Sequence, residues 1–258
     1  MEKIEIATHR GGSKRFPENS LAAFLESWAH LAIPEMDIQR LSDGLLLVCH
    51  DETLDRTVEN LPSSLKNRPL SEISSKEIKE LTLETTLKGF SPPLPLFEEV
   101  LQYVQKDPKK QIFIDNKSAS LTREILPLIE YYRVEKQCWV TGTSLSDLEE
   151  AKKLLPTIHT QVWVNAPSLE EVDSLFTKAL ANSCIDSVLF VLAKSRKPTS
   201  SFHLPHWYIK ESELKCRKKK HSLAVYYTQY TRPLFQELRS LGVRRFAVDV
   251  LEDFKQLL

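Results

Sequence analysis

The sequence lacks an excess of charge of either sign, because its 35 lysines and arginines balance 35 aspartates and glutamates. A nucleic-acid-binding protein usually carries a strongly basic surface, so we expect no nucleic-acid partner. No run of about 18 apolar residues is present, so we expect no membrane span. With 41% hydrophobic and 27% charged residues, the chain also lacks the bias of disordered, collagen-like or simple coiled-coil proteins.

Cysteine is scarce, with four residues far apart and no pair spaced as Cys-x-x-Cys. This spacing favours buried thiols in a reducing compartment over a zinc site or a disulfide framework. The N-terminus runs directly into a strand pattern, without an apolar segment of signal-peptide length. We therefore expect a cytoplasmic location.

Short apolar runs alternate with longer helical patterns over the 258 residues of the chain. Such strand–helix units are typical of a parallel sheet with helices outside it. We expect strands at residues 4–8, 35–40, 45–49, 112–115, 138–141, 160–164, 187–191, 223–227 and 245–250. We expect helices after residue 20 and at residues 98–105, 121–132, 144–154, 168–182 and 232–241. The length and strand number favour one TIM-type (β/α)8 barrel, so residues 1–258 are predicted to form a single domain.

Two of the expected strands are joined by a tight turn, because Asp43-Gly44 separates residues 35–40 from 45–49. These two strands should be antiparallel, which leaves eight strands for the barrel and one return strand. Residues 51–93 then break the strand–helix order and are rich in Ser, Thr, Leu, Pro and Lys. We predict that they form a small insertion after the second strand, with one short helix near residues 75–81.

A histidine and an arginine follow the first expected strand, in the motif His9-Arg10-Gly11-Gly12. The C-terminal ends of barrel strands form the face on which active sites lie. The planar fork of an arginine suits phosphate, and the glycines permit a close approach of the backbone. Taken alone, this short motif fits a flexible turn with a solvated arginine equally well.

Two carboxylates alternate on the second strand, where Glu35 and Asp37 should share one face. Such a pair resists burial without a cation, and oxygen ligands of this kind suit Mg²⁺ or Ca²⁺. The alternative is an edge strand that shows its polar face to water. If Asp43 and Gly44 alone form the loop, Asp37 lies opposite His50, with Cβ atoms about 4.5–5.5 Å apart. A longer loop would shift this register.

A third carboxylate, Asp115, ends the strand at residues 112–115 and shares a face with Lys117. Together with the preceding motifs, these residues bring two histidines, three carboxylates and two cations to one mouth of the barrel. A site with three carboxylates for a metal and two cations for phosphate fits cleavage of a phosphodiester.

At this point the sequence resembles the glycerophosphodiester phosphodiesterase family of phosphatidylinositol-phospholipase-C-like barrels. The resemblance is dense over roughly the first 120 residues and thin afterwards. The matching motifs are His9-Arg10-Gly11, Pro17-Glu18-Asn19-Ser20, Glu35-Met36-Asp37-Ile38, Ser42-Asp43-Gly44, Val48-Cys49-His50-Asp51, Leu54-Asp55-Arg56-Thr57, residues 95–101, Ile114-Asp115-Asn116-Lys117, Leu241-Gly242-Val243 and Val248-Asp249.

The resemblance implies a TIM-type barrel with a small insertion and a metal-dependent hydrolase of glycerophosphodiesters. It implies the following roles: His9 and His50 as the acid–base pair, Glu35, Asp37 and Asp115 as ligands of one divalent cation, Arg10 and Lys117 as phosphate contacts, and Asn19 as a supporting residue. The chain departs from the family at Asp115, where a glutamate is usual, and at Asn116, where an apolar residue is usual. A third departure is Tyr226-Tyr227-Thr228-Gln229, where the family often has Trp-Thr-Val-Asn.

The fold alone does not exclude a metal enzyme that acts on a substrate without phosphate, and two further functions stay open on the sequence. One is a lysophospholipase D-like or phospholipase-like member of the same superfamily, for which an apolar groove in residues 51–93 would be expected. The other is a catalytically weak barrel that binds a phosphate ligand, although binding alone does not require two acid–base groups. The expected partner is a small glycerophosphodiester, and the sequence does not define the oligomeric state.

Overall fold

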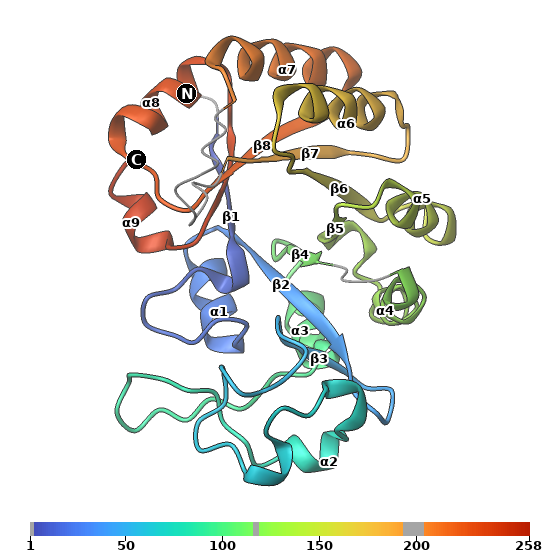
Figure 1. Cartoon of the computed structure of the whole chain (residues 1–258), viewed down its shortest axis with the longest axis vertical. Coiled ribbons are helices and arrows are strands. Elements are labelled where there is room, and N and C mark those ends of the chain that lie inside the picture. Colours follow the sequence, from blue (N-terminus) through green and yellow to red (C-terminus); the bar gives the residue numbers. More distant parts are fainter. Residues whose placement is uncertain (1–2, 116–118, 193–203) are drawn as a thin grey trace.

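The computed structural model describes residues 3–115, 119–192 and 204–258. Figure 1 shows strands at the centre of the molecule and helices around them. The strands are β1 (Glu5–Thr8), β2 (Ile33–Arg40), β3 (Leu46–Val48), β4 (Ile112–Asp115), β5 (Cys138–Gly142), β6 (His159–Val164), β7 (Ser187–Val191), β8 (Ser222–Tyr227) and β9 (Arg245–Val248). These strands match the expected ones to within two residues at each end.

Helices follow most of the strands, and all of those that the structure describes except α7 and α9 were expected from the sequence. The helices are α1 (Leu21–Ala29), α2 (Ser75–Ile78), α3 (Phe97–Gln105), α4 (Ala119–Tyr132), α5 (Leu145–Leu154), α6 (Leu169–Ala181), α7 (His206–Lys219), α8 (Arg232–Ser240) and α9 (Leu251–Lys255). The expected short helix at residues 75–81 ends earlier, at Ile78, while α7 and α9 were not predicted. In the described part of the chain, no helix has the length and apolar composition needed to cross a bilayer.

Eight parallel strands close into a barrel in the order β1, β9, β8, β7, β6, β5, β4 and β2. The barrel closes where β1 pairs with β2, with Ala7 beside Ile33 and Thr8 beside Pro34. The ninth strand, β3, pairs with β2 in the antiparallel sense, as expected of a return strand. The chain is therefore a (β/α)8 barrel of the TIM type.

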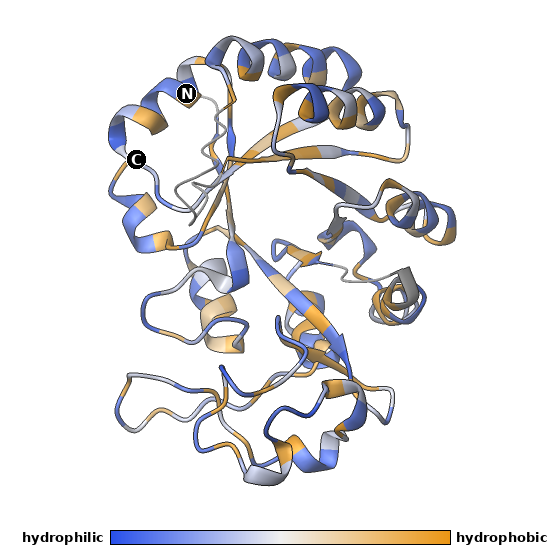
Figure 2. Cartoon of the chain, viewed as in Figure 1, coloured by the Kyte–Doolittle hydropathy of each residue, from blue (hydrophilic) through white to orange (hydrophobic). Residues whose placement is uncertain are grey.

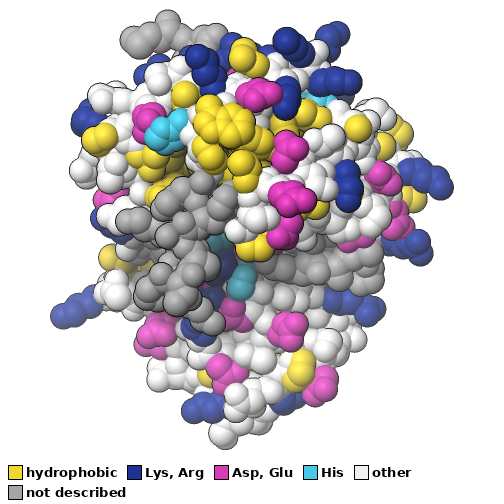
Figure 3. Space-filling view, turned by 45° about the horizontal axis from the view of Figure 1, so that its top comes forward, with side chains coloured by type: hydrophobic (Ala, Val, Ile, Leu, Met, Phe, Trp, Pro, Cys, Tyr) yellow, Lys and Arg dark blue, Asp and Glu magenta, His cyan; other side chains and the backbone are white. Residues whose placement is uncertain are grey.

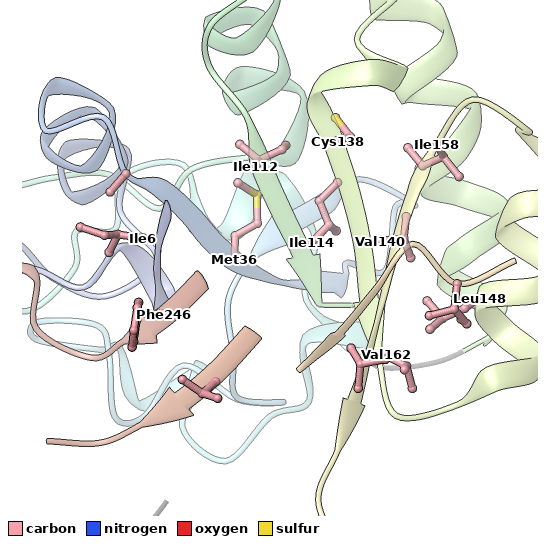
Figure 4. Packing of buried hydrophobic residues seen from close by; sticks show 14 of the residues in the cluster. Ile6, Met36, Ile112, Ile114, Cys138, Val140, Leu148, Ile158, Val162 and Phe246 are labelled. Carbon is pink, nitrogen blue, oxygen red and sulfur yellow. The ribbon is translucent and has the colours of Figure 1, made fainter. Parts of the chain in front are cut away.

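The two faces of the barrel strands carry different side chains, because successive residues point to opposite sides. Outward residues such as Met36, Ile114 and Phe246 belong to one large buried cluster beneath the helices (Figure 4). The surrounding helices alternate between apolar and polar residues, as helices with one buried face do (Figure 2). Inward residues form smaller layers, one of which contains Phe113 and Trp139.

The predicted register of the hairpin between β2 and β3 was wrong by one residue. Ile38 pairs with Val48, and the backbone N–H of Cys49 donates to the carbonyl of Asp37 at 3.0 Å. Asp37 thus lies opposite Cys49, and not opposite His50. The loop has three residues because Leu41 N–H donates to the carbonyl of Leu45, and Gly44 closes the turn at a φ of +86°. A turn that ends in a left-handed glycine is a common three-residue hairpin connection.

Residues 51–93 surround a second buried apolar cluster, which is separate from the main one. Leu54, Leu70 and Ile73 belong to this cluster together with Leu47 of β3. Helix α2 is fixed at its start by Glu77, whose carboxylate accepts hydrogen bonds of 2.8 Å from both the backbone N–H and the hydroxyl of Ser74. The apolar residues of this segment are thus largely used to hold it on the barrel. That residues 1–258 make up one domain stays a prediction.

Candidate functional site

The loop after β1 places His9 and Arg10 at the C-terminal mouth of the barrel. Arg10 has a φ of +52°, and the backbone N–H of Gly12 donates to the carbonyl of His9 at 2.9 Å. Gly11, at a φ of +88°, lies so close to α1 that an added Cβ would stand 2.6 Å from the Cβ of Ala23. This turn therefore requires glycine, and it aims the two preceding side chains across the mouth.

Three carboxylates converge at this mouth. Glu35 and Asp37 point inward from β2, and Asp115 ends the neighbouring strand β4 directly beside Asp37. Each offers an oxygen within 4.8 Å of the others. All three are buried, with exposures of 5%, 1% and 6%. Burial, followed by repulsion from Asp37, raises the pKa of Glu35 to about 8.

Donors from the first loop hold two of these carboxylates. The backbone N–H of Arg10 donates to Oε2 of Glu35 at 2.9 Å, and its side-chain Nε lies 3.3 Å from Oδ2 of Asp37. The amide of the buried Asn19 donates to the same Asp37 oxygen at 2.9 Å. Oε1 of Glu35 is buried and has no hydrogen-bond partner among the described residues. A buried oxygen in that state, next to two further carboxylates, fits a divalent cation with oxygen ligands.

His9 is oriented by a residue from the other end of the chain. Its Nδ1 lies 2.8 Å from Oδ1 of Asp249, which also accepts a hydrogen bond of 2.7 Å from the hydroxyl of Tyr226. Burial alone would lower the pKa of His9, but the bond to Asp249 and the charge of Glu35 outweigh it and raise that pKa. Burial likewise opposes ionisation of Asp249, yet the bonds from His9 and Tyr226 bring its pKa below the usual value.

His50 is held in a similar way by its neighbour in the sequence. Its Nδ1 lies 2.6 Å from Oδ1 of Asp51, whose other oxygen accepts a bond from Arg56. That arginine is the main reason why the pKa of Asp51 falls to about 2. An ionised carboxylate can only accept, so Nδ1 of each histidine carries the proton and Nε2 is left for a substrate.

The two histidines line one open cleft of about 740 Å³. Its walls are the side chains or backbone of His9, Arg10, Gly12, Ser13, Glu18, His50, Asp51, Arg56, Tyr226, Thr228 and Asp249. Figure 3 shows histidine, acidic and basic side chains gathered in a hollow near the middle of one face. A smaller cavity of about 150 Å³ lies inside the barrel mouth; it shares His9 and Tyr226 with the cleft and is also lined by Glu35.

Most of the residues predicted for the site lie together in the structure. Arg10, Asn19, Glu35, Asp37 and Asp115 form one connected group, while His9 and His50 line the adjoining cleft. Lys117 lies outside the described residues, so its predicted role stays a prediction.

Sequence reasoning missed the carboxylate partners of the histidines. Asp249 lies just beyond the end of β9, the position at which the other site residues were found, and that placement was a usable signal. Asp51 follows His50 directly, and Arg56 lies five residues further on. Tyr226, near the end of β8, was noted as a departure but not as a hydrogen-bond donor to the site.

The chain is thus a parallel (β/α)8 barrel that carries three carboxylates and two histidines at the C-terminal ends of its strands. Residues 9–184 match the model of the glycerophosphoryl diester phosphodiesterase family, and the chain belongs to this family.

Curated relatives carry related names. A glycerophosphodiester phosphodiesterase of Bacillus altitudinis is 30% identical over 165 residues, which are 61% of this chain and 65% of that protein. One of Caldanaerobacter subterraneus is 29% identical, over 60% of this chain and 64% of that protein. The matched parts cover less than two thirds of either relative.

Solved structures share the fold over nearly the whole chain. A glycerophosphodiester phosphodiesterase of Agrobacterium tumefaciens has a TM-score of 0.72 at 21% identity, covering 98% of this chain and 99% of that one. A phosphodiesterase of Oleispira antarctica, solved with the product sn-glycerol-3-phosphate, has a TM-score of 0.72 at 17% identity, with coverages of 98% and 96%. At these identities the likeness concerns the fold alone.

Proposed function

We propose that this chain hydrolyses glycerophosphodiesters to glycerol phosphate and an alcohol. The observation that carries the proposal is the placement of two carboxylate-bound histidines, His9 and His50, in one cleft next to three buried carboxylates. A phosphate-binding barrel would need no such pair of acid–base groups. Family membership and the names of the curated relatives support the same activity.

In this proposal Glu35, Asp37 and Asp115 hold one divalent cation, Mg²⁺ or Ca²⁺. The unpartnered Oε1 of Glu35 and the mutual proximity of the three carboxylates support that assignment. When bound, the cation would draw charge from the phosphate oxygens. Asn19 supports this site by fixing Asp37.

The remaining steps belong to the side chains that line the cleft. One histidine accepts a proton at Nε2 from the attacking hydroxyl, which belongs either to water or to the glycerol of the substrate. The other histidine donates a proton to the leaving alcohol oxygen. Arg10 contacts the phosphate and offsets the charge that develops there, and Lys117 is assigned the same task.

The chemistry of the cleft favours a deacylated diester over a lysophospholipid. Its walls include several charged side chains, among them Glu18, Asp51 and Arg56, and these are poor neighbours for an acyl chain. Most apolar residues of the segment 51–93 are packed in the second cluster and are not free to form an acyl groove.

The test compares product release from glycerophosphocholine, glycerophosphoethanolamine and lysophosphatidylcholine, each with metal-loaded protein at equal substrate concentration. We expect the two deacylated diesters to be cleaved faster. Cleavage of the lysophospholipid alone would favour the lysophospholipase D-like alternative. Binding of the diesters without release of any product would favour the binding barrel.

A further inference from the structure

Arg56 bridges two carboxylates at the rim of the cleft. Its Nε donates to Oδ2 of Asp51 at 2.6 Å. Its Nη2 and Nη1 donate to the two oxygens of Glu18 at 2.6 and 3.0 Å. The guanidinium of Arg56 thus joins the segment after β3 to the loop after β1. Arg56 and Glu18 are 38 residues apart in the sequence.

Each of these two carboxylates also accepts a hydrogen bond from a residue of the site. Asp51 binds Nδ1 of His50 at 2.6 Å through its other oxygen. Glu18 accepts from Nη1 of Arg10 at 3.2 Å. A continuous series of charge-assisted bonds therefore runs from the imidazole of His50 to the guanidinium of Arg10, with Arg56 in the middle.

The geometry of this series depends on a planar group with several donors. Arginine offers Nε and both Nη atoms in a fixed fork, so it engages Asp51 with one edge and both oxygens of Glu18 with another. A lysine would be a point charge with a single nitrogen. The side chain of Arg56 is 50% exposed, and ion pairs in such positions contribute little to stability. We therefore expect the bridge made by Arg56 to orient Asp51 and Glu18 and to contribute little to the stability of the fold.

We propose that Arg56 is a positioning residue that fixes His50 relative to Arg10 through Asp51 and Glu18. This role rests on the function proposed above, because in that function His50 and Arg10 act on the same phosphodiester. Misplacement of an acid–base group by about 1 Å can cost about 100-fold in rate, so a residue without substrate contact can still control turnover.

The kinetic test uses Arg56→Gln, Arg56→Lys and the matched control Arg68→Gln in metal-loaded protein. Arg68 belongs to the same segment and pairs with Glu77, away from the cleft. We expect Arg56→Gln to lower kcat by about 10–100-fold with a much smaller change in KM. Arg56→Lys should fold normally and restore only a minor part of kcat, while Arg68→Gln should match the wild type. A raised KM at unchanged kcat would instead make Arg56 a substrate contact and overturn the proposal.

A double-mutant cycle with Asp51→Asn tests the route. If Arg56 acts through Asp51, the double variant should lose clearly less than the product of the two single losses. Fully multiplicative losses would show that Arg56 does not act through Asp51 and would overturn the proposed route.

A spectroscopic test keeps this proposal separate from the proposed function. In nitrogen–proton spectra of the histidine rings, His50 should show a protonated Nδ1 in the wild type. Arg56→Gln should shift that signal, and Arg68→Gln should not. If the wild type cleaves no diester while the signal shifts as expected, the proposed function fails and the positioning role stands. An unchanged His50 signal in Arg56→Gln would refute the positioning role.

Discussion

The buried carboxylates should make the metal-free protein less stable as the pH rises. Glu35 is 5% exposed, and its pKa is raised to about 8 from the 4.5 of an ordinary glutamate. Because the folded state holds this proton more tightly than the unfolded state, the associated stability is fully present below about pH 4.5 and is lost towards about pH 8. At about 1.4 kcal/mol for each tenfold change in proton affinity, the loss is of the order of 5 kcal/mol.

Urea unfolding followed by circular dichroism at pH 5 to 8 in chelator measures this loss. The variant Glu35→Gln should show a much flatter profile and should exceed the wild type in stability at pH 8. Glu80→Gln, at an exposed position, is the control and should follow the wild type. A wild-type stability that does not change over this range would refute the electrostatic reasoning.

Adding Mg²⁺ or Ca²⁺ should offset part of this loss, because the cation binds the folded state. At a concentration of about 100 times Kd the gain is about 2.7 kcal/mol. For a chain of this size that is a rise in Tm of about 5–10 °C. Glu35→Gln should gain much less, and an equal gain in both proteins would place the cation elsewhere.

Other substitutions test the remaining parts of the site and its support. His9→Ala and His50→Ala should each lower kcat by about 10²–10⁴-fold without unfolding the protein, and the double variant should lose less than the product of the two, as initial rates will show. Tyr226→Phe removes one charge-assisted hydrogen bond to Asp249, the carboxylate partner of His9, so kcat should fall by about 10-fold. Gly11→Ala should lower the free energy of unfolding in urea by about 3 kcal/mol, because the added Cβ would lie 2.6 Å from the Cβ of Ala23 at a residue whose φ is +88°. Gly89→Ala, where φ is +74° and the space is open, should cost about 1 kcal/mol.

Local patterns predicted the parts of the fold that depend on neighbouring residues. Alternation along β2 correctly placed Glu35 and Asp37 on one face, and the strand–helix order predicted the closed barrel. The hairpin register was wrong because the same Asp43-Gly44 pair fits both a two-residue and a three-residue loop. The hydrogen bond from Leu41 to Leu45 selects the longer one.

The position of Asp249 after a strand was a local signal that it faces the barrel mouth, but no local pattern indicated that it would pair with His9. His9 and Asp249 are 240 residues apart and meet only because β1 pairs with β9 when the barrel closes. Helix α7 was missed for a different reason. Its buried face includes Ser212 and Glu213 next to Cys216, so the apolar periodicity that marks a helix is interrupted.

The most direct test of the proposed site is the release of glycerol phosphate from glycerophosphocholine during metal titration of chelator-stripped protein. The proposal predicts that turnover starts near zero and rises to saturation with Mg²⁺ or Ca²⁺. At saturating metal, His50→Ala should stay about 10²–10⁴-fold below the wild type, and Asp37→Asn should need far more metal. Full turnover by the stripped protein, or a wild-type rate in His50→Ala, would contradict a metal-dependent centre built from these carboxylates and histidines.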